Sequence, residues 1–319
     1  MNSSLLLFII AAVNCQKSIG GVTLAGLDFG VDIWGNRQGW YNNPNQGDIW
    51  HFSQQSVKLF RIPFSWHYIQ PSLNGPLDEG YFGMFNGLVQ AALSTGAQVI
   101  IDCHNYGHYN GQIIGQGGPT NDQFVDLWSK VASRFASNDK IIFGIMNEPH
   151  DMSMDLWSNT AQLAVNAIRN AGAKSQVILI PGDHFSSAEK FPDSFESLKG
   201  IVDFDGTNNL LLFDLHKYGD YDNSGRWWDC VTDNVQAFQT VYDLLKQNGR
   251  QAIVSETGSQ PSQSCVELMR KQMQFISEKG DVFVSWVAWA SGVNDGNSIT
   301  PRPDGSDQIP WIYVFKPFI

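Results

Sequence analysis

The sequence predicts an α/β fold, a single-domain (β/α)8 TIM barrel. Eight short apolar runs alternate with amphipathic stretches along the 319 residues, which is typical of repeated strand–helix units around a parallel sheet. Eight near-equal units favour a closed barrel over an open, doubly wound sheet. The chain is 43% hydrophobic, enough for one large core, and it contains no Ser/Thr/Pro-rich linker or low-complexity tract. We therefore expect one barrel without an attached binding module.

The predicted strands are apolar runs bounded by turn or charged residues. In chain order they are residues 22–30, 57–64, 97–105, 140–148, 176–182, 209–218, 251–258 and 282–291. The stretches between them repeat apolar residues three and four positions apart, most clearly over 81–93 and 124–135, and this spacing predicts amphipathic helices. Residues 191–207 lack that regularity. We expect a surface excursion there in place of a clean helix.

The charge balance limits the class of partner. Lys and Arg total 20 against 31 Asp and Glu, a formal net charge of −11, which disfavours nucleic acid and acidic membrane surfaces. At 16% charged and 13% aromatic the chain is too apolar for disorder, and no apolar run is long enough to span a bilayer. We expect a monomer with a neutral ligand, no nucleic-acid partner and no membrane partner.

Residues 1–15 have the pattern of a secretory signal peptide. A short polar start precedes an apolar run from Leu5 to Val13, and small residues near Cys15 suit cleavage. A buried N-terminal strand is the alternative interpretation. We expect the signal to be removed and residues 16–319 to be secreted, into an environment where disulfides form.

Cleavage near Cys15 leaves three cysteines in the secreted chain. Cys103 lies in the apolar run 99–103 and shares no metal-ligand spacing with another cysteine, so we expect a buried thiol. Cys230 and Cys265 each begin a predicted helix in neighbouring units, where they could form a disulfide.

Polar side chains collect where the predicted strands end, and in a barrel all these ends meet at one rim. They are Arg61 near the end of the second strand, His104 at the end of the third, Asn147 and Glu148 at the end of the fourth, His216 and Tyr218 at the end of the sixth, Glu256 at the end of the seventh and Trp289 at the end of the eighth. The fourth and seventh strands lie across the barrel mouth from each other, so their two glutamates can face one another. Two facing carboxylates are what cleavage of a glycosidic bond requires. The alternative is that each glutamate caps a helix or pairs with a lysine at the rim. This alternative can account for a single glutamate at a strand end more easily than for two.

Several motifs carry a family resemblance. The runs Gly118-Pro119-Thr120-Asn121 and Phe143-Gly144-Ile145-Met146-Asn147-Glu148-Pro149-His150-Asp151 resemble glycoside hydrolase family 5, in particular the fungal-type endo-β-1,4-glucanases (cellulases) of its subfamily 5. Asn147-Glu148-Pro149, His216-x-Tyr218, Glu256-Thr257-Gly258 and a closing Trp289 follow in the family's order. The resemblance covers essentially the whole chain after the signal, which makes residues 16–319 the expected catalytic domain.

The resemblance implies a retaining double displacement. Glu148 would be the general acid/base and Glu256 the nucleophile, with the two carboxyl groups about 5–5.5 Å apart. No cofactor is expected for this chemistry. The sequence also has no His-Glu-x-x-His, Gly-x-x-x-x-Gly-Lys-Ser/Thr or Gly-x-Ser-x-Gly motif, so metal-dependent hydrolysis, nucleotide binding and serine hydrolysis find no support.

The resemblance also implies a set of substrate-binding residues: Arg61, His104, Asn147, His216, Tyr218 and Trp289. Arg61 would contact Glu256 and hold it ionised. Asn147 would hydrogen-bond the sugar 2-hydroxyl, and Trp289 would stack beneath the sugar ring at the cleavage point. The two histidines and Tyr218 would line the same subsite.

Other tryptophans and two loops bear on the choice of substrate. Candidates for further sugar subsites are Trp34, Trp40, Trp66, Trp227, Trp228 and Trp286, whereas Trp128 and Trp157 lie in helical patterns and are expected in the core. The loops that begin at Gly182 and Gly219 depart from the family pattern, which leaves the exact glucan open. Two alternatives remain at this point, a β-mannanase or other hemicellulase of the same fold and a non-catalytic carbohydrate-binding barrel. The latter predicts the loss of at least one carboxylate.

Overall fold

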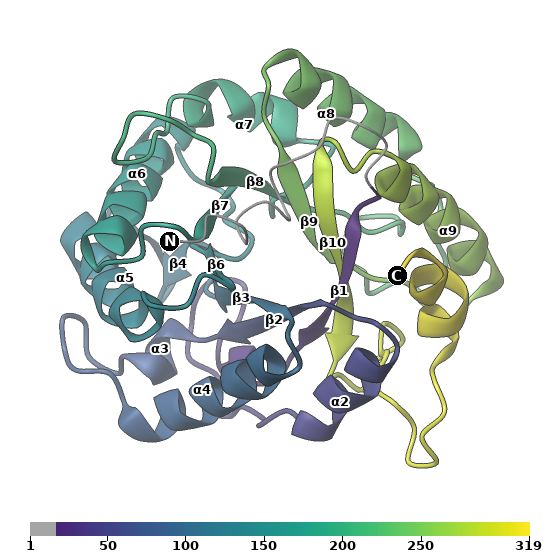
Figure 1. The fold of residues 1–319 in the computed structure, drawn as a ribbon. Helices are drawn as coiled ribbons and strands as arrows, with labels where there is room; N and C mark the ends of the chain where they lie inside the picture. Colours follow the sequence, from purple (N-terminus) through teal and green to yellow (C-terminus); the bar gives the residue numbers. More distant parts are fainter. Residues whose placement is uncertain (1–16) are drawn as a thin grey trace, which may run out of the picture.

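The strands of the protein form a closed parallel barrel. The computed structural model describes residues 17–319, and the barrel has the strand order β1-β10-β9-β8-β7-β6-β3-β2 (Figure 1). Its strands are β1 (Ile19–Leu24), β2 (Leu59–Phe64), β3 (Gln98–Cys103), β6 (Ile141–Gly144), β7 (Val177–Pro181), β8 (Leu211–His216), β9 (Ala252–Thr257) and β10 (Phe283–Ser291). The predicted (β/α)8 barrel is confirmed.

Helices surround the barrel and cover the outer side of its strands (Figure 1). They are α2 (Gln46–Gln54), α3 (Trp66–Ile69), α4 (Glu79–Ser94), α5 (Asn121–Phe135), α6 (Met154–Asn170), α7 (Phe191–Leu198), α8 (Val235–Gln247) and α9 (Gln263–Glu278). A small hairpin of β4 (His108–Tyr109) and β5 (Gln112–Ile113) follows β3. The start of α5 agrees with its sequence, since Thr120 and Gln123 form a capping box there.

Two layers of apolar side chains make up the core. The barrel interior is filled by strand residues such as Leu59, Ile100 and Ile253, and a larger layer lies between strands and helices. Trp128 and Trp157 belong to that outer layer, where their indole N–H groups donate to the backbone carbonyls of Ile145 and Pro181 at 3.1 and 2.9 Å. Their predicted place in the core is confirmed.

Two predictions about local structure were wrong. The first strand runs from Ile19 to Leu24, and the expected second half is a 3-10 turn over Leu27–Gly30, because Gly26 with φ 148° breaks the strand. The segment expected to lack a clean helix begins with α7, which buries Phe191, Phe195 and Leu198 on one face. Only the part after this helix is irregular.

The cysteines are arranged as expected, with one difference. Cys230 and Cys265 form a disulfide, and Cys103 is a buried free thiol. Cys265 lies in the first turn of α9, but Cys230 lies in the loop before α8 and does not begin that helix. The disulfide therefore ties this loop to α9.

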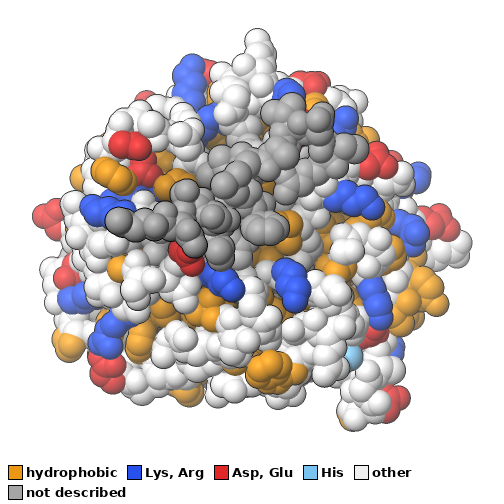
Figure 2. All heavy atoms as spheres, viewed as in Figure 1, with side chains coloured by type: hydrophobic (Ala, Val, Ile, Leu, Met, Phe, Trp, Pro, Cys, Tyr) orange, Lys and Arg blue, Asp and Glu red, His pale blue; other side chains and the backbone are white. Residues whose placement is uncertain are grey.

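The signal peptide expected over residues 1–15 lies outside the described residues. Between residues 17 and 319, no helix combines the length and apolar character needed to cross a membrane. On the face drawn in Figure 2, acidic and basic side chains are interspersed, so the surplus of negative charge is not gathered in one patch there.

Candidate active site

The eight residues singled out from the sequence meet at the C-terminal rim of the barrel. A cavity of about 410 Å³ opens there, and five of the eight line it: His104, Glu148, Tyr218, Glu256 and Trp289. The other three, Arg61, Asn147 and His216, are fully buried and contact those residues from below. The rim of the barrel thus brings the whole predicted set together.

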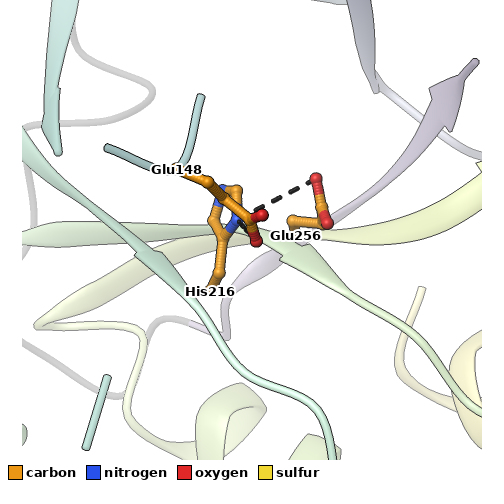
Figure 3. A group of neighbouring side chains, drawn as sticks. All are labelled: Glu148, His216 and Glu256. Carbon is orange, nitrogen blue, oxygen red and sulfur yellow. Dashed lines mark hydrogen bonds and ion pairs between the residues drawn. The ribbon is translucent and has the colours of Figure 1, made fainter. Parts of the chain in front are cut away.

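The two glutamates face each other across this cavity. Glu256 extends from β9, and Glu148 follows β6 with a left-handed backbone of φ 45°. One carboxylate oxygen of each and a ring nitrogen of His216 lie within 4.8 Å of one another (Figure 3). A non-glycine residue at positive φ carries backbone strain, and such strain is concentrated at functional sites. At Glu148 it aims the side chain at Glu256.

Glu256 is held as a carboxylate by two donors. Arg61 Nη1 donates to Oε2 at 2.7 Å, and the Tyr218 hydroxyl donates to Oε1 at 2.8 Å. Burial alone would raise the pKa of Glu256, but the positive charges of His216 and Arg61 outweigh it and keep that pKa below its ordinary value. Glu256 is therefore ionised and fixed in position.

Arg61 connects the site to neighbouring strands. Its Nη2 donates to Asp102 Oδ2 at 3.0 Å and to Asn147 Oδ1 at 2.5 Å. Burial works against the charge, but the carboxylates of Asp102 and Glu256 raise the pKa of Arg61 above its ordinary value. With its oxygen so engaged, Asn147 presents an Nδ2 donor that finds no partner within residues 17–319. That donor is buried and unpaired among these residues.

The two histidines are oriented by acidic neighbours. His216 Nδ1 contacts Glu148 Oε1 at 2.8 Å, while Nε2 contacts the Ser255 hydroxyl at 3.0 Å. Burial lowers the pKa of His216, but the carboxylates of Glu256 and Glu148 raise it above its ordinary value. His104 Nδ1 likewise contacts Asp102 Oδ2 at 2.9 Å. In both histidines a carboxylate therefore holds the Nδ1 atom of the ring.

Trp289 forms one wall of the cavity, and its ring stacks on His104 with centroids 5.6 Å apart. Two other tryptophans predicted as sugar subsites were assigned wrongly. Trp66 and Trp286 are fully buried: Trp66 packs edge-on against Tyr109, and Trp286 stacks on Phe315. Trp66 follows β2 and Trp286 lies in β10, and both side chains pack in the layer between strands and helices. Nearness to a strand end in sequence therefore did not bring them to the cavity.

Several residues that line the cavity were not predicted from the sequence. They are Ile33, Tyr106, Phe185, Asp222, Asn223, Ser224, Arg226, Asp295 and Asn297. All of them lie in loops that follow barrel strands, and this position is the only signal that would have found them. Asp102, which pairs with Arg61, precedes His104 at the end of β3 and carried the same signal.

A (β/α)8 barrel with two facing carboxylates at the carboxyl ends of its strands defines a glycoside hydrolase. The cellulase family, glycosyl hydrolase family 5, matches residues 20–292. The chain belongs to this family, as the sequence motifs predicted.

Known relatives agree with this assignment. The chain is 44% identical over 307 residues to a manganese dependent endoglucanase, Eg5A, of Phanerodontia chrysosporium, covering 94% of this chain and 79% of that protein. It is 43% identical to endoglucanase EG-II of Hypocrea jecorina, covering 90% and 73%. The crystal structure of Cel5A (EG2) from Hypocrea jecorina superposes with a TM-score of 0.89 at 39% identity, covering 95% and 99% of the two chains. XacCel5A in complex with cellopentaose gives 0.87 at 29% identity, covering 95% and 99%.

The name of the first relative raises the question of a metal. Within the described part of the chain, one group of three side chains could hold an ion: Glu148, His216 and Glu256. Carboxylate and imidazole ligands suit manganese. However, both oxygens of Glu256 already accept hydrogen bonds, from Arg61 and Tyr218, and a divalent ion would have to lie beside the buried guanidinium. These residues therefore do not fit a resident metal.

Proposed function

We propose that the protein is a secreted endo-β-1,4-glucanase that hydrolyses internal bonds of cellulose and related β-glucans with retention of configuration. The observation that carries the proposal is the closeness of the two carboxylates, since one oxygen of Glu148 and one of Glu256 lie within 4.8 Å of each other. Retaining enzymes hold their carboxyl groups about 5–5.5 Å apart, whereas inverting enzymes need about 6.5–9.5 Å to admit a water molecule. The spacing supports direct attack by one carboxylate.

In the first step Glu256 attacks the anomeric carbon while Glu148 gives its proton to the glycosidic oxygen, so the bond to the leaving sugar breaks. The product is a glycosyl ester of Glu256. In the second step Glu148 takes a proton from water, the hydroxide attacks the anomeric carbon, and the ester bond breaks. Glu256 returns as a carboxylate and Glu148 as an acid.

The surroundings of each carboxylate suit these roles. Glu256, as nucleophile, must be ionised before the first step, and Arg61 and Tyr218 stabilise that charge. Glu148 must exchange a proton with the substrate, and its side chain is more exposed than that of Glu256, at 17% against 8%. Formation of the ester removes the charge beside Glu148, which favours its action as a base in the second step.

The substrate class is supported by the relatives, which are named endoglucanases, and by the cellopentaose bound in XacCel5A. The free Nδ2 of Asn147 suits the 2-hydroxyl of the sugar at the cleavage point. The flat face of Trp289 suits the apolar face of the same ring. Secretion rests on the signal pattern over residues 1–15, and we propose residues 16–319 as the monomeric catalytic domain.

The test is release of reducing sugar from carboxymethyl cellulose, mixed-linkage β-glucan and mannan by the secreted chain, with Glu148→Gln and Glu256→Gln as matched variants. We expect release from both glucans and a loss of about 10²–10⁴-fold or more in each variant. Proton NMR of the first product should show the β-anomer. Release from mannan alone would replace the glucan assignment, and release from none of the three would support a carbohydrate-binding barrel.

A further inference from the structure

The loop between β8 and α8 exposes an unusual number of aromatic side chains. Tyr221, Trp227 and Trp228 are 82%, 56% and 60% exposed. The same loop lines the cavity with Asp222, Asn223, Ser224 and Arg226. Among the exposed aromatic residues, Trp227 directly follows Arg226, which lines the cavity, and its indole contacts Asp222, which also lines it.

This loop is held rigidly at its centre. Gly225 has φ 74°, and a Cβ placed there would come within 2.7 Å of the Tyr218 ring, so the loop backbone packs directly on that ring. The Gly225 carbonyl accepts hydrogen bonds from Gln260 Nε2 at 2.8 Å and Asn297 Nδ2 at 2.6 Å. The loop is thus fixed to the two neighbouring strand-end loops, and the disulfide of Cys230 anchors its far end.

Trp227 is oriented despite its exposure. Its backbone N–H donates to Asp220 Oδ2 at 3.1 Å, and its indole Nε1 donates to Asp222 Oδ2 at 2.9 Å. An exposed indole normally keeps its rotational freedom and loses it on binding, at a cost in free energy. Because Asp222 already holds the ring edge, that cost is largely removed before a ligand arrives.

We propose that Trp227 is a sugar-binding platform in an outer subsite, which stacks on the apolar face of a glucose unit of a β-1,4-glucan beyond the cavity. This proposal rests on the proposed glucanase function and adds a subsite to it. Stacking of a flat apolar surface on indole supplies affinity, and the neighbouring Arg226 guanidinium, which lines the cavity, offers donors for sugar hydroxyls. A glucan chain is favoured as the occupant because Trp227 is bonded to Asp222 and adjoins Arg226, and both of these residues line the cavity that would hold the cleaved bond.

The test compares Trp227→Ala with the wild-type enzyme on cello-oligosaccharides from cellotriose to cellohexaose and on a chromogenic cellobioside. We expect kcat/KM for cellohexaose to fall about three- to tenfold, with the loss growing with chain length and absent for the short cellobioside. Trp227→Phe should recover part of the loss. Trp50→Ala is the matched control, because this tryptophan is 48% exposed but lies on α2 and not on the loop between β8 and α8.

Three results would overturn the proposal. A loss equal for all chain lengths, no loss at any length, or the same length-dependent loss in Trp228→Ala would each remove Trp227 as the platform. Each variant should have the same melting temperature as the wild type, so that a change in kcat/KM reflects glucan binding and not a loss of folded enzyme. If the wild-type enzyme cleaves none of these glucans, the proposed function itself fails, and this outcome is distinct from an active enzyme that is indifferent to Trp227.

Discussion

Removing the hydrogen bond from Tyr218 to Glu256 should change the pKa of the candidate nucleophile without changing the fold. Tyr218→Phe removes one hydroxyl, which donates to Glu256 Oε1 at 2.8 Å, and leaves the contact with Arg61 intact. A hydrogen bond to a charged group contributes about 1.5–3 kcal/mol. Loss of this donor should therefore destabilise the carboxylate form of Glu256 by about that amount and raise its pKa.

The assay is the pH dependence of kcat/KM on soluble mixed-linkage β-glucan, because its acid limb reports ionisation in the free enzyme. We expect the acid limb of Tyr218→Phe to move to higher pH. Tyr242→Phe is the matched control, since the Tyr242 hydroxyl donates to Asp281 at 3.1 Å outside the cavity. An acid limb in Tyr218→Phe that coincides with the wild-type limb would refute the assignment of Tyr218 as a donor that stabilises the ionised nucleophile.

Three further outcomes are expected. The pKa of Glu256 is lower in the folded protein than in the unfolded chain, so its ionised form stabilises the fold above the unfolded pKa, and this stability is lost as pH falls through the folded pKa. The melting temperature of Glu256→Gln should therefore depend less on pH between about 3 and 5 than that of the wild type. Parallel curves of melting temperature against pH would contradict this. Cys230→Ser should lower the free energy of unfolding by up to about 4 kcal/mol in urea titrations, because the disulfide to Cys265 spans 35 residues; an unchanged value would show that the loop is held without it. Trp66→Ala should cost about 3–5 kcal/mol of stability by the same titration, because the indole is fully buried; normal stability with weakened glucan binding would restore its predicted subsite role.

The fold was predictable because it depends on a pattern that many residues share. Each strand is a short apolar run, and eight repeats compensate for errors at single boundaries. The errors occurred where one residue decides the outcome. Gly26 ends the first strand early through its backbone conformation, and α7 is short enough that its three buried apolar residues did not stand out as a period.

The floor of the site was predictable for a related reason. Residues at strand ends meet at the rim whatever the loops do, so Arg61 and both glutamates could be placed from their position in sequence. The walls could not be placed in this way, because a loop residue reaches the cavity only if the loop turns toward it. Arg226 lines the cavity because Gly225 packs on Tyr218, a contact between residues whose pairing the sequence does not encode locally.

The contacts of Arg61 have a consequence for protein engineering. One guanidinium joins side chains from β3, β9 and the segment after β6. Substitution of any one partner therefore leaves a charge or an amide unpaired inside the barrel. Apart from Asn147, which follows β6, these partners lie on the strands themselves. Loops from other barrels of the family that are joined beyond Glu148 and Tyr218 should therefore alter which chains are bound while the reacting groups beneath keep their positions and charges.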